Sequence, residues 1–238
     1  NENPKHSIAF KMVLSDQKIE AKVLDVLWTP SKDGYLKPRV RIEPVKLGGV
    51  TIEYATGYHG AFIKENKIGI GAKIELIRSG DVIPKIVNVI TPATHPKMPD
   101  INYIWNETNI EVMLEDGGET NDIVREKNIV GFFVGLDVVG LSSGNIRRLM
   151  NAGYDSVEKI LKMKKEDFLK VEGFKDKMAT KIYNSIHEQI KKASLSKIMS
   201  ASNIFSRGIG EKKIDIILEY FPNILTSNKS LDKKIEDI

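Results

Sequence analysis

The chain has 238 residues, of which 41% are hydrophobic, so it can form one large domain or two small ones with real cores. It contains no cysteine, which excludes disulfide bonds and thiolate metal sites. The sequence has no signal peptide and no apolar run long enough to cross a membrane, so we expect a cytoplasmic protein.

The charge is unevenly distributed. Residues 1–96 hold 14 basic and 10 acidic residues, residues 97–128 hold 3 and 8, and residues 129–238 hold 19 and 14. Two mildly basic lobes therefore flank an acidic joint. Basic lobes fit a polyanion partner, although ordinary lysine-rich solubility explains the charge equally well.

The first 90 residues indicate a linker followed by a β-barrel. Residues 1–18 are expected to be the end of a preceding domain and a linker. In residues 19–90 apolar and polar residues alternate, for example at Val50, Ile52 and Tyr54, which is typical of half-buried antiparallel strands. Turn residues at 33–34, 48–49 and 79–81 separate the strands. Short strands at this spacing predict a small closed barrel, and an OB-fold fits its size best.

Residues 91–128 change character and are predicted to be a linker region. Residues 91–99 are rich in proline, which excludes a helix or a central strand. Ile110, Val112 and Leu114 alternate as in a strand of a hairpin. The acidic balance of this stretch argues against a position on DNA.

From residue 129 to residue 238 the period becomes helical. Three glycines, Gly140, Gly173 and Gly208, recur roughly every 35 residues, and each precedes a predicted helix. This repeat predicts an all-α domain of helix–hairpin–helix units. In such a unit a glycine turn lets backbone amides and the positive end of the second helix approach a phosphate. Gly210, Lys175 and Lys212 lie at the same turns. Plain tight turns in a helical bundle are the alternative.

Four separated blocks of the barrel resemble the OB domain of NAD-dependent DNA ligases. They are R-I-E-P-V at 41–45, G-V-T-I-x-x-A-T at 49–56, I-G at 70–71 and R-S-G-D-V-I-P at 78–84. The order of the predicted parts also resembles that family. A barrel comes first, and repeated hairpins come last. Between them, the linker at 91–128 holds a degenerate region where the family has a four-cysteine zinc finger. The resemblance implies the C-terminal part of such an enzyme.

The resemblance also implies roles for single residues. Lys11 matches a lysine that closes the family's nucleotidyltransferase domain and contacts the adenylate phosphate, whereas a solvated lysine at a strand end is the plain alternative. Lys32 stands in a loop where the family has an arginine that touches DNA. The remaining barrel candidates for DNA contact are Arg39, Arg41, His59 and Arg78. For His59, a histidine in a surface turn is an equally good interpretation. The zinc ligands are absent, so no structural zinc is predicted.

A ligase needs a lysine nucleophile in a K-x-D-G motif, and the sequence contains none. We therefore expect a trimmed chain or a separate subunit that is inactive alone and works with a nucleotidyltransferase domain, NAD and Mg²⁺. Its expected role is to clamp nicked double-stranded DNA for sealing, the barrel and the hairpins completing a ring with the missing domain. The alternative is a non-catalytic DNA-binding module derived from a ligase; an RNA-binding OB protein is disfavoured, because paired hairpins suit duplex DNA.

Overall fold

The computed structural model describes residues 18–47, 49–77, 84–205, 207–228 and 233. The chain divides into two compact units, a barrel unit up to Gly117 and a helical unit from Gly118. The second unit thus begins earlier in the chain than the predicted helical domain at residue 129. Each unit has its own hydrophobic core.

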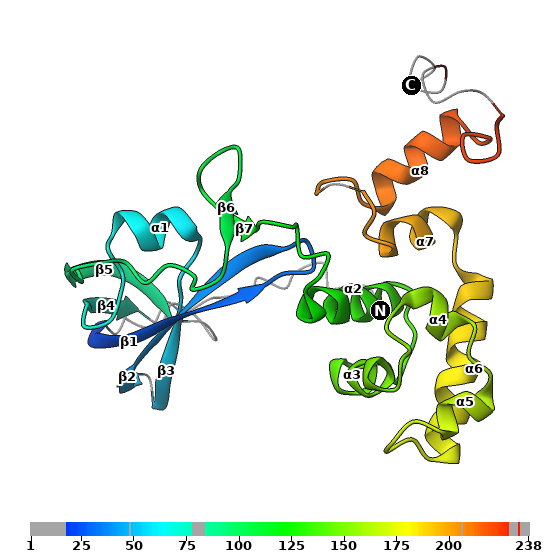
Figure 1. Cartoon of the computed structure of the whole chain (residues 1–238). Helices are drawn as coiled ribbons and strands as arrows, with labels where there is room; N and C mark the ends of the chain where they lie inside the picture. Colours follow the sequence, from blue (N-terminus) through cyan, green and yellow to red (C-terminus); the bar gives the residue numbers. More distant parts are fainter. Residues whose placement is uncertain (1–17, 48, 78–83, 206, 229–232, 234–238) are drawn as a thin grey trace, which may run out of the picture. The chain divides into compact units, whose positions relative to one another are not determined.

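Five strands of the barrel unit close into a barrel (Figure 1). They are β1 (Lys18–Pro30), β2 (Tyr35–Leu47), β3 (Val50–Thr56), β4 (Lys73–Ile77) and β5 (Lys85–Thr91). Going round the barrel, β1 pairs with β2, then follow β3, β5 and β4, and β4 returns to β1. The short helix α1 (Gly60–Glu65) connects β3 to β4. This topology is that of the predicted OB-fold.

Alternation along the strands separates the core from the outer face. On β2, Val40 and Ile42 are buried, whereas Arg39, Arg41 and Glu43 are exposed. The side-chain period of two residues therefore places charged groups on the outside of the barrel wherever the inside is apolar.

Residues 92–98 belong to the barrel and are not a free linker. Trp28 Nε1 donates a hydrogen bond to the backbone oxygen of Lys97 at 3.0 Å. Ala93 and Met98 pack against the barrel core. The proline-rich stretch forms neither helix nor strand, as predicted, but it covers part of the core.

A small hairpin, β6 (Tyr103–Trp105) and β7 (Val112–Leu114), extends the barrel sheet. β7 pairs with β2 through Val112 and Leu36. A Cβ atom built on Gly60 of α1 would lie 3.0 Å from Val112 and 3.1 Å from the Trp105 ring, and Lys64 Nζ lies 5.1 Å from the centre of that ring. Of the residues predicted to alternate, Val112 and Leu114 are buried in β7, whereas Ile110 precedes the strand and is 45% exposed. The apolar contacts with α1 hold this region to the barrel.

The helical unit contains seven helices within its described residues. They are α2 (Asp122–Gly135), α3 (Ser143–Asn151), α4 (Val157–Leu161), α5 (Lys165–Leu169), α6 (Asp176–Lys192), α7 (Leu195–Ala201) and α8 (Glu211–Tyr220). The buried residues of α2 include Ile129, Phe132 and Phe133, which follow the predicted helical period. α2 starts at Asp122, well before residue 129. Its N-cap residue Asn121 accepts hydrogen bonds from two first-turn amides.

An acid-sensitive contact lies at the start of α5. Asp167 accepts hydrogen bonds from the Lys164 backbone amide at 3.0 Å and from Lys170 Nζ at 2.9 Å. The Lys164 bond, followed by the Lys170 bond, holds the pKa of Asp167 below its usual value of 3.8. Because folding favours the ionised form, its stabilisation is present above about pH 4 and is lost as the pH falls through the lower folded pKa.

Asp167→Asn is therefore expected to flatten the acid-side loss of stability of the helical unit. Urea unfolding followed by helical circular dichroism from about pH 3 to about pH 7 measures it. Glu166→Gln, which removes the adjacent carboxylate, is the control. Parallel stability profiles for the Asp167 variant and the wild-type chain would contradict the assignment.

Candidate nucleic-acid interface

Arg39 and Arg41 lie together on the outer face of the barrel. Both side chains are exposed on β2, two residues apart. Arg41 is opposite Tyr54 of β3, and the Arg39 guanidinium lies 3.9 Å from the centre of the Tyr54 ring. Neither arginine forms an ion pair with another described residue, so both charges are available to a polyanion. Sequence reasoning missed Tyr54 because only the strand register brings it beside Arg39.

The neighbouring lysine on this face is already engaged. Lys37 forms an ion pair with Glu111, which precedes β7. Its charge is thus partly neutralised by the hairpin, unlike the charges of the two arginines further along β2.

Lys32 lies in the tight loop between β1 and β2. The Ser31 hydroxyl accepts the backbone amides of Asp33 at 3.3 Å and Tyr35 at 3.2 Å, which closes the loop. The Lys32 side chain is exposed, and Gly34 has φ +76°. The loop therefore presents Lys32 before the start of β2, whereas Arg39 and Arg41 lie further along that strand.

His59 has a structural role in the barrel. Its Nδ1 accepts the backbone amide of Phe62 at 3.2 Å and so caps the N-terminus of α1. The ring is half-buried. The other two predicted residues of the N-terminal half, Lys11 and Arg78, lie outside the described residues.

Three turns of the helical unit share one geometry. The glycines Gly140, Gly173 and Gly208 have φ angles of +94°, +82° and +92°, a region that residues with side chains rarely adopt. Each glycine lies three residues before the first residue of the next helix, α3, α6 or α8. The structure thus places all three predicted glycines at turns between helices.

The helices that follow these turns begin without a side-chain cap. The N-cap residues of α3, α6 and α8 are Ser142, Lys175 and Gly210. In the part of the chain that the structure describes, none of them forms a side-chain hydrogen bond to the first turn of its helix. In contrast, α2, α4 and α7 are capped by Asn121, Ser156 and Ser194. The short helix α5, which follows none of the three glycine turns, also receives no side-chain bond from its N-cap residue. Lys175 and Lys212 are exposed beside the uncapped ends. Free amides, the positive helix ends and nearby lysines together attract anions.

The first two glycine turns are each packed against the other's second helix. A Cβ atom on Gly140 would lie 2.8 Å from Ile182 of α6, and the Val139 amide donates to the buried Ser185 hydroxyl of α6 at 3.0 Å. A Cβ atom on Gly173 would lie 2.9 Å from the Arg148 Nη1 atom of α3. At Gly208 no described atom lies within 4 Å of such a Cβ. The first and second turns therefore form one packed pair.

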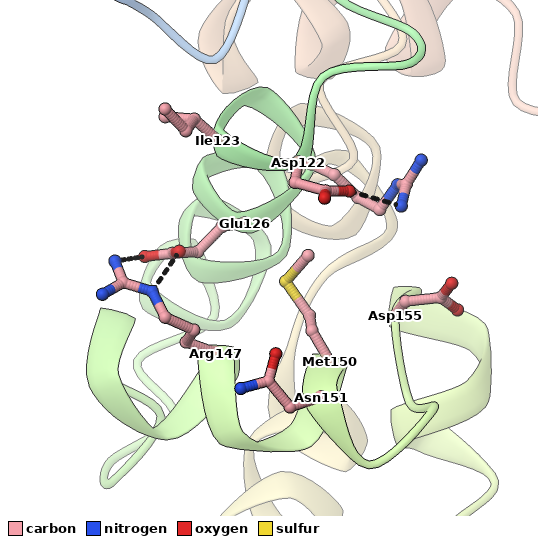
Figure 2. Close-up of a pocket in the computed structure, with 8 residues that line it drawn as sticks. Asp122, Ile123, Glu126, Arg147, Met150, Asn151 and Asp155 are labelled. Atoms are coloured by element: carbon pink, nitrogen blue, oxygen red, sulfur yellow. Dashed lines mark hydrogen bonds and ion pairs between the residues drawn. The ribbon is translucent and has the colours of Figure 1, made fainter.

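A depression of about 480 Å³ lies between α2, α3 and the start of α4 (Figure 2). Figure 2 shows Arg147 of α3 reaching Glu126 of α2, with two hydrogen bonds of 3.0 and 3.1 Å. Arg125 likewise pairs with Asp122 at 2.9 Å. Because its cations are paired and Asp155 adds a carboxylate, this depression does not suit a polyanion.

The described ranges hold no group of three or more His, Cys, Asp or Glu side chains that could bind a metal ion. Nowhere in the described chain is a helix both long and apolar enough to span a bilayer.

Comparison with known proteins finds a family match for the barrel. Residues 20–98 match the NAD-dependent DNA ligase OB-fold domain. The chain is 41% identical to a DNA ligase of Acanthamoeba polyphaga mimivirus, over 99% of this chain and 37% of that protein. It is 39% identical to the putative DNA ligase 052L of Invertebrate iridescent virus 3, over 91% of the chain and 28% of that protein. A DNA ligase of Desulfatibacillum aliphaticivorans is 32% identical, over 90% of this chain and 33% of that protein.

The chain thus spans about a third of the length of these relatives. The matched segment ends at Met98, the residue whose side chain completes the barrel core beyond β5. As its motifs predicted, residues 20–98 match the OB-fold domain of NAD-dependent DNA ligases, and 90% or more of the chain is similar to part of known DNA ligases.

Proposed function

We propose that this chain is the DNA-binding portion of an NAD-dependent DNA ligase and that it clamps nicked duplex DNA for sealing. The observation that carries the proposal is the set of three glycine turns, each followed three residues later by an uncapped helix. They follow a ligase-type OB-fold in the same chain. We interpret the turns as helix–hairpin–helix units.

Each turn suits a phosphate for a physical reason. The positive φ of the glycine lets the backbone bend sharply, so that amides can approach the nucleic acid without a Cβ atom between them. The uncapped first-turn amides then donate to phosphate oxygens, assisted by the helix dipole. Such contacts position a protein on duplex DNA without reading its sequence. This suits an enzyme that must act at any nick.

The barrel would add side-chain contacts. Arg39 and Arg41 present two guanidinium groups on one outer face, and each can bind a phosphate through two parallel hydrogen bonds. Lys32 offers a single point charge at the end of the barrel. These residues are our candidates for the barrel's share of the clamp.

The adenylylation chemistry would belong to a separate nucleotidyltransferase domain. Since the sequence holds no K-x-D-G motif, this chain should not form a covalent adduct with AMP from NAD. In our proposal that domain holds NAD and Mg²⁺, while this chain keeps the nick in place during attack by the 3′-hydroxyl. The predicted phosphate contact by Lys11 belongs to the same proposal.

The test combines binding and sealing. We expect the chain to bind nicked duplex DNA, with a logarithm of affinity that falls linearly with the logarithm of salt concentration, by about 0.9 per phosphate contact. We also expect it to accelerate sealing of a pre-adenylylated nick only when a nucleotidyltransferase domain from a related ligase is added. Binding without sealing in any combination would favour a non-catalytic DNA-binding module. Absence of binding at about 50 mM salt would reject both functions.

A further inference from the structure

Arg148 occupies the space beside the second glycine turn although it belongs to the helix that follows the first. It lies on α3, and its guanidinium fills the position that a side chain at residue 173 would take. A Cβ atom on Gly173 would lie 2.9 Å from Arg148 Nη1 and 3.1 Å from Cζ. The missing side chain at Gly173 thus leaves room for an arginine from another hairpin.

The charge of Arg148 is not neutralised by the protein. The side chain forms no ion pair with any residue that the structure describes, and its nearest polar contact is a long one, 3.5 Å to Asn145 Oδ1. Its neighbour Arg147 differs, because two hydrogen bonds join it to Glu126. Two adjacent arginines on one helix therefore have opposite states: Arg147 is engaged and Arg148 is available.

Asn145 connects Arg148 to the first turn. Its Nδ2 donates to the backbone oxygen of Gly140 at 2.7 Å, and its Oδ1 faces Arg148. A line of polar contacts thus runs from Gly140 through Asn145 and Arg148 to the Gly173 turn. In this structure the guanidinium therefore lies between the two turns.

We propose that Arg148 binds a DNA backbone phosphate together with the Gly173 turn, so that the first hairpin contributes the cation of the second hairpin's phosphate site. The proposal rests on the proposed function and names one residue for it. A phosphate held by the amides at the start of α6 would lie next to a guanidinium, whose planar fork can donate two hydrogen bonds to it. The site is then complete only when both hairpins are correctly packed.

The first test compares Arg148→Ala with Arg147→Ala on nicked duplex DNA over a salt series. We expect Arg148→Ala to weaken binding about tenfold and to reduce the salt slope by about 0.9, the value for one lost phosphate contact. Arg147→Ala should change affinity less than about twofold, since its charge is already paired. Arg148→Lys should keep the salt slope and lose part of the affinity, because lysine lacks the planar fork.

The second test asks whether Arg148 acts at the Gly173 turn. Gly173→Ala forces the guanidinium away, whereas Gly208→Ala introduces the same backbone strain at a turn with no described neighbour. Arg148→Ala combined with Gly173→Ala should weaken binding by less than the product of the single effects. Combined with Gly208→Ala, the effects should multiply. Thermal unfolding of each variant checks that the helices remain folded.

The outcomes distinguish a failure of the Arg148 assignment from a failure of the proposed function. If the wild-type chain binds DNA and Arg148→Ala behaves like Arg147→Ala, the assignment of Arg148 is wrong while the proposed function stands. If Arg148→Ala weakens binding but its effect multiplies with that of Gly173→Ala, the shared site is wrong. If the wild-type chain fails to bind at low salt, the proposed function is wrong and the assignment falls with it.

Discussion

Replacing Phe133 with alanine is expected to lower the free energy of unfolding of the helical unit by about 3–5 kcal/mol, the cost of a large cavity in a packed core. Phe133 is fully buried in α2 and makes an edge-to-face contact with Phe132, with ring centres 5.3 Å apart. It belongs to the core that joins α2 to α3 and α6. The substitution removes both the buried apolar area of the side chain and its contact with the Phe132 ring. We therefore expect it to be the most destabilising single change in the helical unit.

Two optical signals allow the units to be followed separately. Both tryptophans, Trp28 and Trp105, lie in the barrel unit, and helical circular dichroism reports mainly on the helical unit. Phe133→Ala should lower the urea midpoint of the dichroism signal and leave that of tryptophan fluorescence unchanged. Val134→Ala, at a residue 59% exposed on the same helix, is the matched control. Equal shifts of both signals would show instead that the units unfold as one.

Removing Arg39 and Arg41 together is expected to produce the largest loss of DNA affinity, about 100-fold or more. Hydrogen bonds to charged groups contribute about 1.5–3 kcal/mol each, which corresponds to roughly 10- to 100-fold in affinity for each arginine. The salt slope should fall by about 1.8, or 0.9 for each lost contact. Titration of nicked duplex with the double alanine variant over a salt series measures both quantities.

The control for this variant removes a lysine from another part of the barrel. Lys73 is exposed on β4, and β4 is not a neighbour of β2 in the barrel order. Lys73→Ala lowers the net charge without touching the proposed face, so it should change affinity less than about threefold. A loss per removed charge as large in Lys73→Ala as in the double variant would mean that overall charge, and not the Arg39–Arg41 face, governs binding.

The sequence predicted the barrel well because each strand carries its own signal. Alternation such as that of Val40 and Ile42 on β2 marks a buried face without knowledge of the partner strands. Of the three residues predicted to alternate on β3, however, only Ile52 is buried, whereas Val50 is 43% exposed and Tyr54 is half-buried. The three glycines predicted turns for the same reason, since a positive φ is a local requirement. The DNA-contact roles of these residues remain predictions.

Contacts between distant residues could not be predicted in this way. The pairing of β7 with β2 joins Val112 to Leu36, and three-residue strands carry too little pattern to indicate a partner. The stacking of Arg39 on Tyr54 depends on the register of two strands. Arg148 and Gly173 meet where α3 packs against the turn before α6, and nothing in either local sequence indicates this contact.

The first two turns of α2 carry no hydrophobic pattern from which the start of the helix could be predicted. Five of residues 122–128 are charged or polar, and of the two apolar ones only Val124 is buried. A single apolar contact does not establish a helical period, so the pattern became visible only from Ile129. Asn121 was the available signal, because it is a favoured N-cap residue placed just before the helix.

The packing of the β6–β7 hairpin on α1 has a consequence for the cellular conditions under which the protein keeps its shape. Where cysteines hold a metal, a chelator or an oxidant can unfold the region without affecting the rest of the chain. Here Trp105 and Val112 rest on Gly60, and β7 is bonded to β2, so the hairpin should persist as long as the barrel does. The region is thereby independent of the supply of zinc and of thiol oxidation.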